Sequence, residues 1–169
     1  MLCSRPVGKG GNWGANVGLL KQPRFRGHSF HRLDSKGRLR IPTKFREILQ
    51  QNYTDGLILT NMPNCLVAYP PEVWEEIESK AVTMSQVQPQ QRSFVRYFIA
   101  SAVECEFDRQ GRILIPPLLR ARAEIDQEVL LIGAMQSIEI WSRDSYEREM
   151  ERSKQNFDQM AQDASVIGV

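Results

Sequence analysis

The chain has 169 residues, 41% of them hydrophobic and 25% charged, which is the composition of an ordinary soluble protein with one domain or two small ones. Its apolar runs are only a few residues long, which excludes a transmembrane helix of roughly 20 residues, and the first residues contain no apolar signal-peptide segment. We therefore expect a cytoplasmic protein without a membrane partner. An odd number of cysteines at wide spacing predicts neither a disulfide framework nor a zinc site: Cys3, Cys65 and Cys105.

Positive charge is concentrated at the front of the chain. The net charge is only +2, but residues 1–46 carry eleven Lys or Arg and one acid, a net +10, whereas residues 47–169 carry eleven Lys or Arg and nineteen acids, a net −8. Such an asymmetry favours contact between the basic part and a polyanion. The alternative is a solvated basic segment that only aids solubility.

The elements of the first half follow from its turn residues and apolar spacing. Residues 1–24 are glycine-rich and lack periodicity, so we expect a disordered extension. Asp34 and Gly37 suit the first and fourth positions of a type I turn, which predicts a hairpin between the strands on either side. Pro42 then ends the second strand and suits the start of a helix. The predicted elements are strands at 28–33 and 38–41, a helix at 44–49, strands at 57–60 and 65–69, and a helix at 72–80.

The pattern of the first half returns in the second half. Residues 33–42 recur as residues 107–116, 74 positions later, with Asp, Gly, Arg, Ile and Pro identical. Asp144 and Glu147, three residues apart, predict a capping box for the last helix. The predicted elements are a linker at 83–89, a helix at 90–102, a strand at 103–107, a helix at 117–123, strands at 129–133 and 137–141, and a helix at 144–160.

Two copies of one small unit predict one shared core. Four short strands and a helical turn cannot bury both sheet faces alone, so we expect the copies to close on each other as a small β-barrel with pseudo-twofold symmetry and peripheral helices. The fold class is then mixed β with short α, and the two turns lie close together. The predicted divisions are a disordered extension at 1–24, a first repeat and helix at 25–79, a linker and helix at 80–102, a second repeat and C-terminal helix at 103–160, and a disordered tail at 161–169.

The doubled motif resembles the MraZ family of transcriptional regulators. MraZ proteins are similar to AbrB-type regulators, so the resemblance implies a swapped-hairpin β-barrel of two tandem SpoVT-AbrB repeats. It also implies a bacterial regulator that binds direct repeats upstream of the division and cell wall gene cluster, forms a ring of eight or twelve subunits and associates with the nucleoid. The segment at 1–24 departs from the family pattern. The resemblance extends from about Phe25 to about Phe157 and is carried by Phe25 to His28, Leu33 to Pro42, and Asp108 with Gly111 and Arg112.

The residues themselves favour the same partner, double-stranded DNA. Basic side chains before, within and after the first turn are interrupted by one acid, Asp34. Lys and Arg on a protruding ribbon can neutralise phosphates, and such a ribbon fits the major groove, where Arg can read guanine with two hydrogen bonds. Acids precede the second turn, so we expect a weaker contact there. The predicted DNA-binding residues are Arg38 first, then Lys36, Arg40 and Arg26, then Arg32, with Arg112 and Arg109 in the second copy.

A structural role competes with DNA binding at the turns. Asp34 and Arg38 flank one turn and can simply pair with each other, and their recurrence as Asp108 and Arg112 in a less basic copy favours that reading. A turn aspartate commonly bonds its own backbone, and a turn glycine supplies a backbone conformation that other residues avoid. The predicted structural turn residues are Asp34, Gly37, Asp108 and Gly111.

Other function classes gain less support. His28 and His31 would point to opposite faces of a strand, so we expect no metal, and we expect no cofactor, small-molecule substrate or catalytic set. Trp74, Trp141 and Tyr146 are expected in the core or an interface. The main alternative is an oligomeric assembly module whose basic front binds an acidic protein surface. An RNA-binding role is less favoured because the basic hairpin lacks interleaved aromatic residues.

Overall fold

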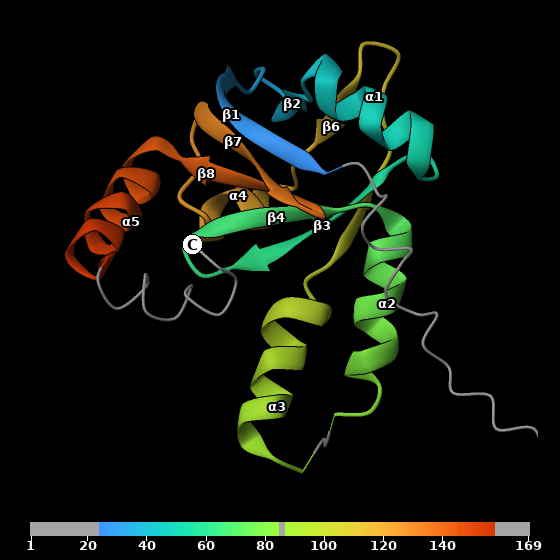
Figure 1. The fold of residues 1–169 in the computed structure, drawn as a ribbon, viewed down its shortest axis with the longest axis vertical. Helices are drawn as coiled ribbons and strands as arrows, with labels where there is room; N and C mark the ends of the chain where they lie inside the picture. The colour runs from blue at the N-terminus through green and yellow to red at the C-terminus, as the bar shows by residue number, and fades with distance from the viewer. Residues whose placement is uncertain (1–23, 85–86, 158–169) are drawn as a thin grey trace, which may run out of the picture.

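The computed structural model of the protein describes residues 24–84 and 87–157; the predicted extension, apart from Arg24, and the predicted tail lie outside this part. Pairs of consecutive strands alternate with helices along the chain (Figure 1). None of the described helices is long and apolar enough to cross a membrane. In chain order the elements are β1 (Phe25–Arg32), β2 (Arg38–Arg40), α1 (Thr43–Asn52), β3 (Leu57–Met62), β4 (Cys65–Tyr69), α2 (Pro71–Ala81), α3 (Pro89–Phe94), the π-helical turn η2 (Val95–Ile99), β5 (Val103–Cys105), β6 (Arg112–Leu114), α4 (Pro117–Arg122), β7 (Glu128–Met135), β8 (Ser137–Ser142) and α5 (Arg143–Gln155).

The strands form two antiparallel sheets (Figure 1). The larger sheet has six strands in the order β1-β7-β8-β4-β3-β5, and β2 and β6 form a separate two-stranded ladder. These sheets and short helices confirm the predicted class of mixed β with short α. The predicted closed barrel is not found, because the described six-stranded sheet ends at β1 and β5, and the chain leaves it after each of these strands to enter the small ladder.

The first strand of each repeat pairs with a strand of the other repeat. β1 pairs with β7 along all eight of its residues, and β5 pairs with β3. The predicted hairpin pairing across the first turn is therefore wrong, because β2 lies against β6. The turn itself is formed, with the Gly37 N–H donating to the Asp34 carbonyl at 2.9 Å and the Asp34 N–H donating to the Arg38 carbonyl at 3.0 Å. The chain thus turns where expected, but the strands that it joins diverge.

The two repeats contribute matching residues to one core. Leu39 and Ile41 of the first repeat and Ile113 and Ile115 of the second are fully buried together. Burial of such a side chain stabilises the fold by about 1.5–3 kcal/mol, so neither repeat can keep this core without the other. Further repeat-related pairs in the same core are Phe45 with Leu119, Leu57 with Val129, Leu59 with Leu131, Leu66 with Ile138, and Ala68 with Ile140.

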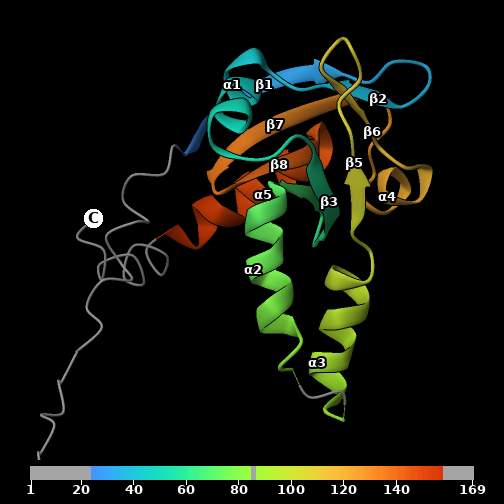
Figure 2. The same ribbon diagram turned by 90° about the vertical axis from the view of Figure 1, so that its right-hand side faces the viewer.

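α2 and α3 extend side by side away from the large sheet (Figures 1 and 2). The helix predicted at 90–102 is present as α3, which continues directly into η2. In η2 the Phe98 carbonyl accepts a hydrogen bond from the buried Thr60 hydroxyl, and the Phe98 ring packs 5.5 Å from that of Trp74 and 6.2 Å from that of Tyr69. This aromatic cluster fixes the base of the two helices to β3 and β4.

The N-cap of α5 lies two residues before the predicted one, Asp144. Ser142 is the N-cap, and its hydroxyl accepts a hydrogen bond from the Ser145 N–H at 3.2 Å. The predicted Asp144–Glu147 capping box is wrong, since Asp144 lies inside the first turn and Glu147 pairs with Arg143 at 3.0 Å. Serine and aspartate both make good caps, and the end of β8 at Ser142 decides which of them does so here.

Candidate nucleic-acid interface

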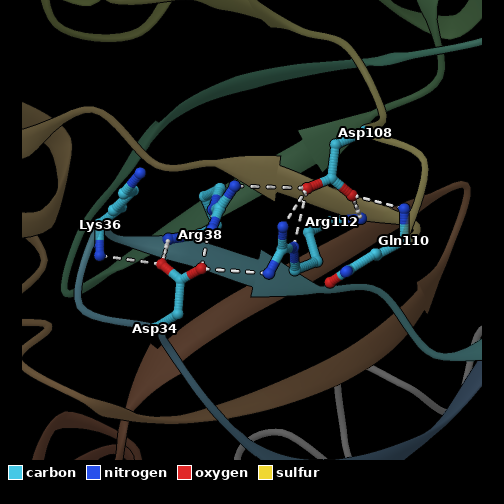
Figure 3. Close-up of polar contacts among 6 residues, drawn as sticks. All are labelled: Asp34, Lys36, Arg38, Asp108, Gln110 and Arg112. Carbon is cyan, nitrogen blue, oxygen red and sulfur yellow. Dashed lines mark hydrogen bonds and ion pairs between the residues drawn. The ribbon is translucent and has the colours of Figure 1, made fainter.

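The turns Asp34–Arg38 and Asp108–Arg112 lie next to each other, one at each end of the β2–β6 ladder (Figure 3). Asp34 Oδ1 accepts hydrogen bonds from the backbone N–H groups of Lys36 and Arg38, both at 2.9 Å. Asp108 does the same for its own turn, at 2.9 and 3.0 Å. Each aspartate therefore bonds the backbone of its own turn and fixes the conformation of the residues that follow it.

The same carboxylates join the two turns through an ion-pair network of four residues (Figure 3). Within each turn the arginine holds its own aspartate, Arg38 to Asp34 and Arg112 to Asp108, with 2.7 Å between nitrogen and oxygen in both cases. Across the repeats, Arg112 Nη1 lies 3.3 Å from Asp34 Oδ2, and Arg38 Nη1 lies 3.8 Å from Asp108 Oδ2. Two positive and two negative charges thus form one neutral cluster.

Hydrogen bonds lower the pKa of both carboxyl groups. The Arg112 guanidinium is the main cause of the pKa of Asp108 falling to about 2, and the Arg38 backbone N–H is the main cause of the lowered pKa of Asp34. Both aspartates are therefore ionised at neutral pH, and the network keeps all its charges there.

Each turn is also packed against an arginine of the other repeat. Gly37 and Gly111 have φ angles of +78° and +70°, in the left-handed region that favours glycine. A Cβ atom at Gly37 would lie 2.8 Å from Cζ of Arg120, and one at Gly111 would lie 2.8 Å from Cζ of Arg46. Sequence reasoning did not assign this role to either arginine. The signal was available, because Arg46 and Arg120 are themselves 74 residues apart.

The structure divides the predicted DNA-binding residues into two groups. Arg38 and Arg112 are largely enclosed in the network, with side chains 32% and 20% exposed. Among the exposed residues, Arg32 adjoins the first turn and donates to Gln127 at 2.6 Å, whereas Arg26 is near the other end of β1, roughly 20 Å along the strand. The exposed group comprises Lys36, Arg40, Arg26, Arg32 and Arg109.

Comparison with known proteins identifies the repeated unit. Residues 24–97 and 98–167 each match the model of the family described as "MraZ protein, putative antitoxin-like". The chain belongs to the MraZ family. It is 57% identical over 150 residues to a protein of Syntrophobacter fumaroxidans named Transcriptional regulator MraZ, covering 89% of this chain and 100% of that protein. Proteins of the same name from Pediococcus pentosaceus and a Thermoanaerobacter species are 39% and 40% identical, covering 86% and 82% of this chain and 99% and 95% of theirs.

The two MraZ repeats share the turn framework and differ in the side chains around it. Asp, Gly and Arg recur at every position of the framework, including the packing arginines of α1 and α4. Three exposed basic residues within and after the first turn are replaced by neutral ones, and two of the replacements, Leu114 and Leu118, are 52% and 62% exposed. The replaced pairs are Lys36 with Gln110, Arg40 with Leu114, and Lys44 with Leu118, while Ser35 with Arg109 changes in the opposite direction.

The remaining candidate side chains pack or hydrogen-bond within the fold. Trp74 and Trp141 are buried, and Tyr146 packs edge-on against Trp141 at 6.1 Å. His31 hydrogen-bonds to Ser29 at 2.8 Å. No group of three or more His, Cys, Asp or Glu among residues 24–84 and 87–157 is arranged to hold a metal ion. Burial raises the pKa of both cysteines of this part well above that of a free thiol, to about 12 in Cys65 and about 11 in Cys105.

Proposed function

We propose that the protein is a sequence-specific DNA-binding transcriptional regulator that contacts double-stranded DNA through its first turn and β2. The observation that carries the proposal is the positive charge that the turns expose in addition to the neutral ion-pair network. Arg38 and Arg112 neutralise Asp34 and Asp108, and the exposed Lys36 and Arg40 form no ion pair among residues 24–84 and 87–157, so they add net positive charge beside the network. The relatives named Transcriptional regulator MraZ support the same function.

The proposed roles follow from how firmly each side chain is held. Arg38 reads a base, because the short bond to Asp34 orients its guanidinium before DNA arrives and so reduces the ordering cost of binding. Lys36 and Arg40 are exposed and neutralise phosphates on either side of it. Arg32 and Arg109 flank this contact, Arg112 supports it through Asp34, and Arg26 meets DNA only if the duplex follows β1.

One turn makes few contacts, so we propose that several subunits act together. The strand exchange between repeats supports the swapped-hairpin architecture of AbrB-like proteins, and the family resemblance implies a ring of eight or twelve subunits. A ring that engages direct repeats upstream of the division and cell wall gene cluster gains affinity by multivalency. The acidic second part of the chain, with α2 and α5, is the proposed site of subunit contacts, since its charge keeps it away from DNA. Nucleoid association follows from this activity.

The proposal is tested by titrating the protein onto a fluorescent duplex from upstream of its own gene, beside a scrambled duplex, over a salt series. We expect the native duplex to remain bound at salt concentrations that release the scrambled one, because phosphate contacts are salt-sensitive and base contacts add to them. Equal, salt-labile binding to both duplexes would contradict sequence-specific recognition. Release of subunits from each other by salt, with no DNA complex, would favour the assembly module.

A further inference from the structure

The second repeat encloses the first turn from several sides. The Gly37 carbonyl accepts a hydrogen bond from the Ile115 N–H at 3.0 Å, and Asp34 is 3.3 Å from Arg112 Nη1. The third contact is the Arg120 guanidinium, three of whose atoms would lie 2.8–3.1 Å from a Cβ atom at Gly37. All three contacts come from the repeat that has fewer exposed basic side chains at its own turn.

Arg120 is unusual among the charged residues of this region. It lies on α4, its Nε is buried, and no hydrogen-bond partner for that atom occurs among the described residues. It also forms no ion pair within the described ranges, in contrast to the arginines of the four-residue network. The contact that the structure does give to the Arg120 guanidinium is its packing against the backbone of the first turn at Gly37.

The equivalent arginine, Arg46, provides an internal comparison. It packs against Gly111 of the second turn at the same distance, but its own guanidinium is anchored, with Nε donating to the Ile41 carbonyl at 3.1 Å and Nη2 donating to the Thr43 hydroxyl at 3.2 Å. At the position of Thr43 the second repeat has Pro117, which has no hydroxyl. The two packing contacts are alike, but they support turns of different surface charge.

We propose that Arg120 is a positioning residue for DNA recognition, which holds the first turn of the opposite repeat in the conformation that presents Lys36 and Arg38. Through Arg120, the second repeat then influences DNA specificity by means of a side chain that does not itself touch the DNA. The inference rests on the proposed function of the first turn and adds a positioning role for a residue of α4. Because Arg46 packs on the second turn, its loss removes the matching contact there, together with its bonds to Ile41 and Thr43, and leaves the packing on the first turn in place.

The test compares Arg120→Met with two matched variants, Arg46→Met and Arg122→Met. Arg122 is exposed on the same helix and donates a hydrogen bond to Ser101 at 3.0 Å, so its variant controls for the lost charge. Binding to the native and scrambled duplexes is measured over a salt series, and melting temperature and subunit number are measured for every variant. If Arg120→Met does not fold, Arg120→Lys, which also lacks the planar group, replaces it under the same criteria.

We expect Arg120→Met to lose at least tenfold in affinity for the native duplex and little for the scrambled one, with an unchanged salt slope. The other two variants should stay within about threefold of the wild type, although Arg46→Met melts at a similarly lowered temperature. Equal losses in the Arg120 and Arg46 variants would overturn the positioning role, and so would a salt slope reduced by about 0.9, which marks a direct phosphate contact. If the wild type fails to discriminate the duplexes, it is the proposed function that fails.

Discussion

The first and second turns share one framework of residues but expose different side chains around it. Both contain an aspartate that bonds the turn backbone, a glycine with positive φ and an arginine 2.7 Å from the aspartate. The first repeat presents Lys36 in its turn and Arg40 on β2, where the second repeat has Gln110 in its turn and Leu114 on β6. The shared residues build the framework, in which Arg38 is also the proposed base reader, and the differing residues supply the surface charge that we propose adapts one copy to DNA.

The largest expected effect is the loss of DNA affinity in Arg38→Ala, compared with that in Arg112→Ala. A two-point contact between Arg and guanine contributes about 1–3 kcal/mol, so Arg38→Ala should weaken binding to the native duplex by roughly 10–100-fold. Arg112→Ala should weaken it much less. The measurement is a fluorescence anisotropy titration, with size-exclusion chromatography as the control for assembly. If Arg38→Ala also loses its assembly, Arg38 serves the framework and the DNA role is contradicted.

The framework itself is tested by replacing each turn glycine with alanine. A residue with a Cβ in the left-handed region costs roughly 1–2 kcal/mol, and at both positions the new Cβ would also displace the guanidinium of the opposite repeat. We therefore expect Gly37→Ala and Gly111→Ala to lower the free energy of unfolding by similar amounts of about 1–2 kcal/mol. Chemical denaturation measures this. A neutral Gly111→Ala would show that the two frameworks are not equivalent.

A smaller effect should distinguish the exposed basic residues. Lys36→Gln removes one proposed phosphate contact and should reduce the salt slope of binding by about 0.9. Arg109→Gln removes an exposed charge from the second turn and should reduce the slope by less than half as much. Equal reductions would mean that both turns lie on DNA in the same way, and the account of two different surfaces would then be wrong.

The smallest effect concerns pH. Because the folded pKa of Asp108 is about 2, below its ordinary value, the ionised carboxylate stabilises the fold at neutral pH, and this contribution is lost as the pH falls from about 4 toward 2. Asp34, whose pKa is also lowered, acts in the same direction. Asp108→Asn should therefore flatten the decline of melting temperature over that range. An unchanged decline would show that the network does not contribute to stability.

Much of the local structure could be predicted from the sequence. The Asp-x-x-Gly spacing located both turns, and apolar alternation located the strands around them, because both signals depend on residues close together in the chain. The pairing of β1 with β7 could not be obtained in this way. Alternation shows that a strand has one buried face and does not identify the strand beside it, so a hairpin was the natural but wrong expectation.

The candidate site was predicted in part for the same reason. Asp34 and Arg38 are four residues apart, and their pairing was foreseen as one of two readings. The cross-repeat bonds of Arg112 to Asp34, and the packing of Arg120 on Gly37, depend on the exchange of strands and were not visible locally. The DNA contacts and the divisions at 25–79, 80–102 and 103–160 stay predictions.

The proposed DNA surface is tested most directly by two variants, each of which gives one repeat the exposed side chains of the other. In one variant Lys36→Gln is combined with Arg40→Leu, and in the other Gln110→Lys is combined with Leu114→Arg, and both are titrated on native and scrambled duplexes over a salt series. We predict that the first variant binds both duplexes more weakly and with a salt slope reduced by about 2, because two phosphate contacts are lost, while the second binds the native duplex within about threefold of the wild type. A first variant with the affinity and salt slope of the wild type would contradict the claim that the first repeat contacts DNA through its turn and β2.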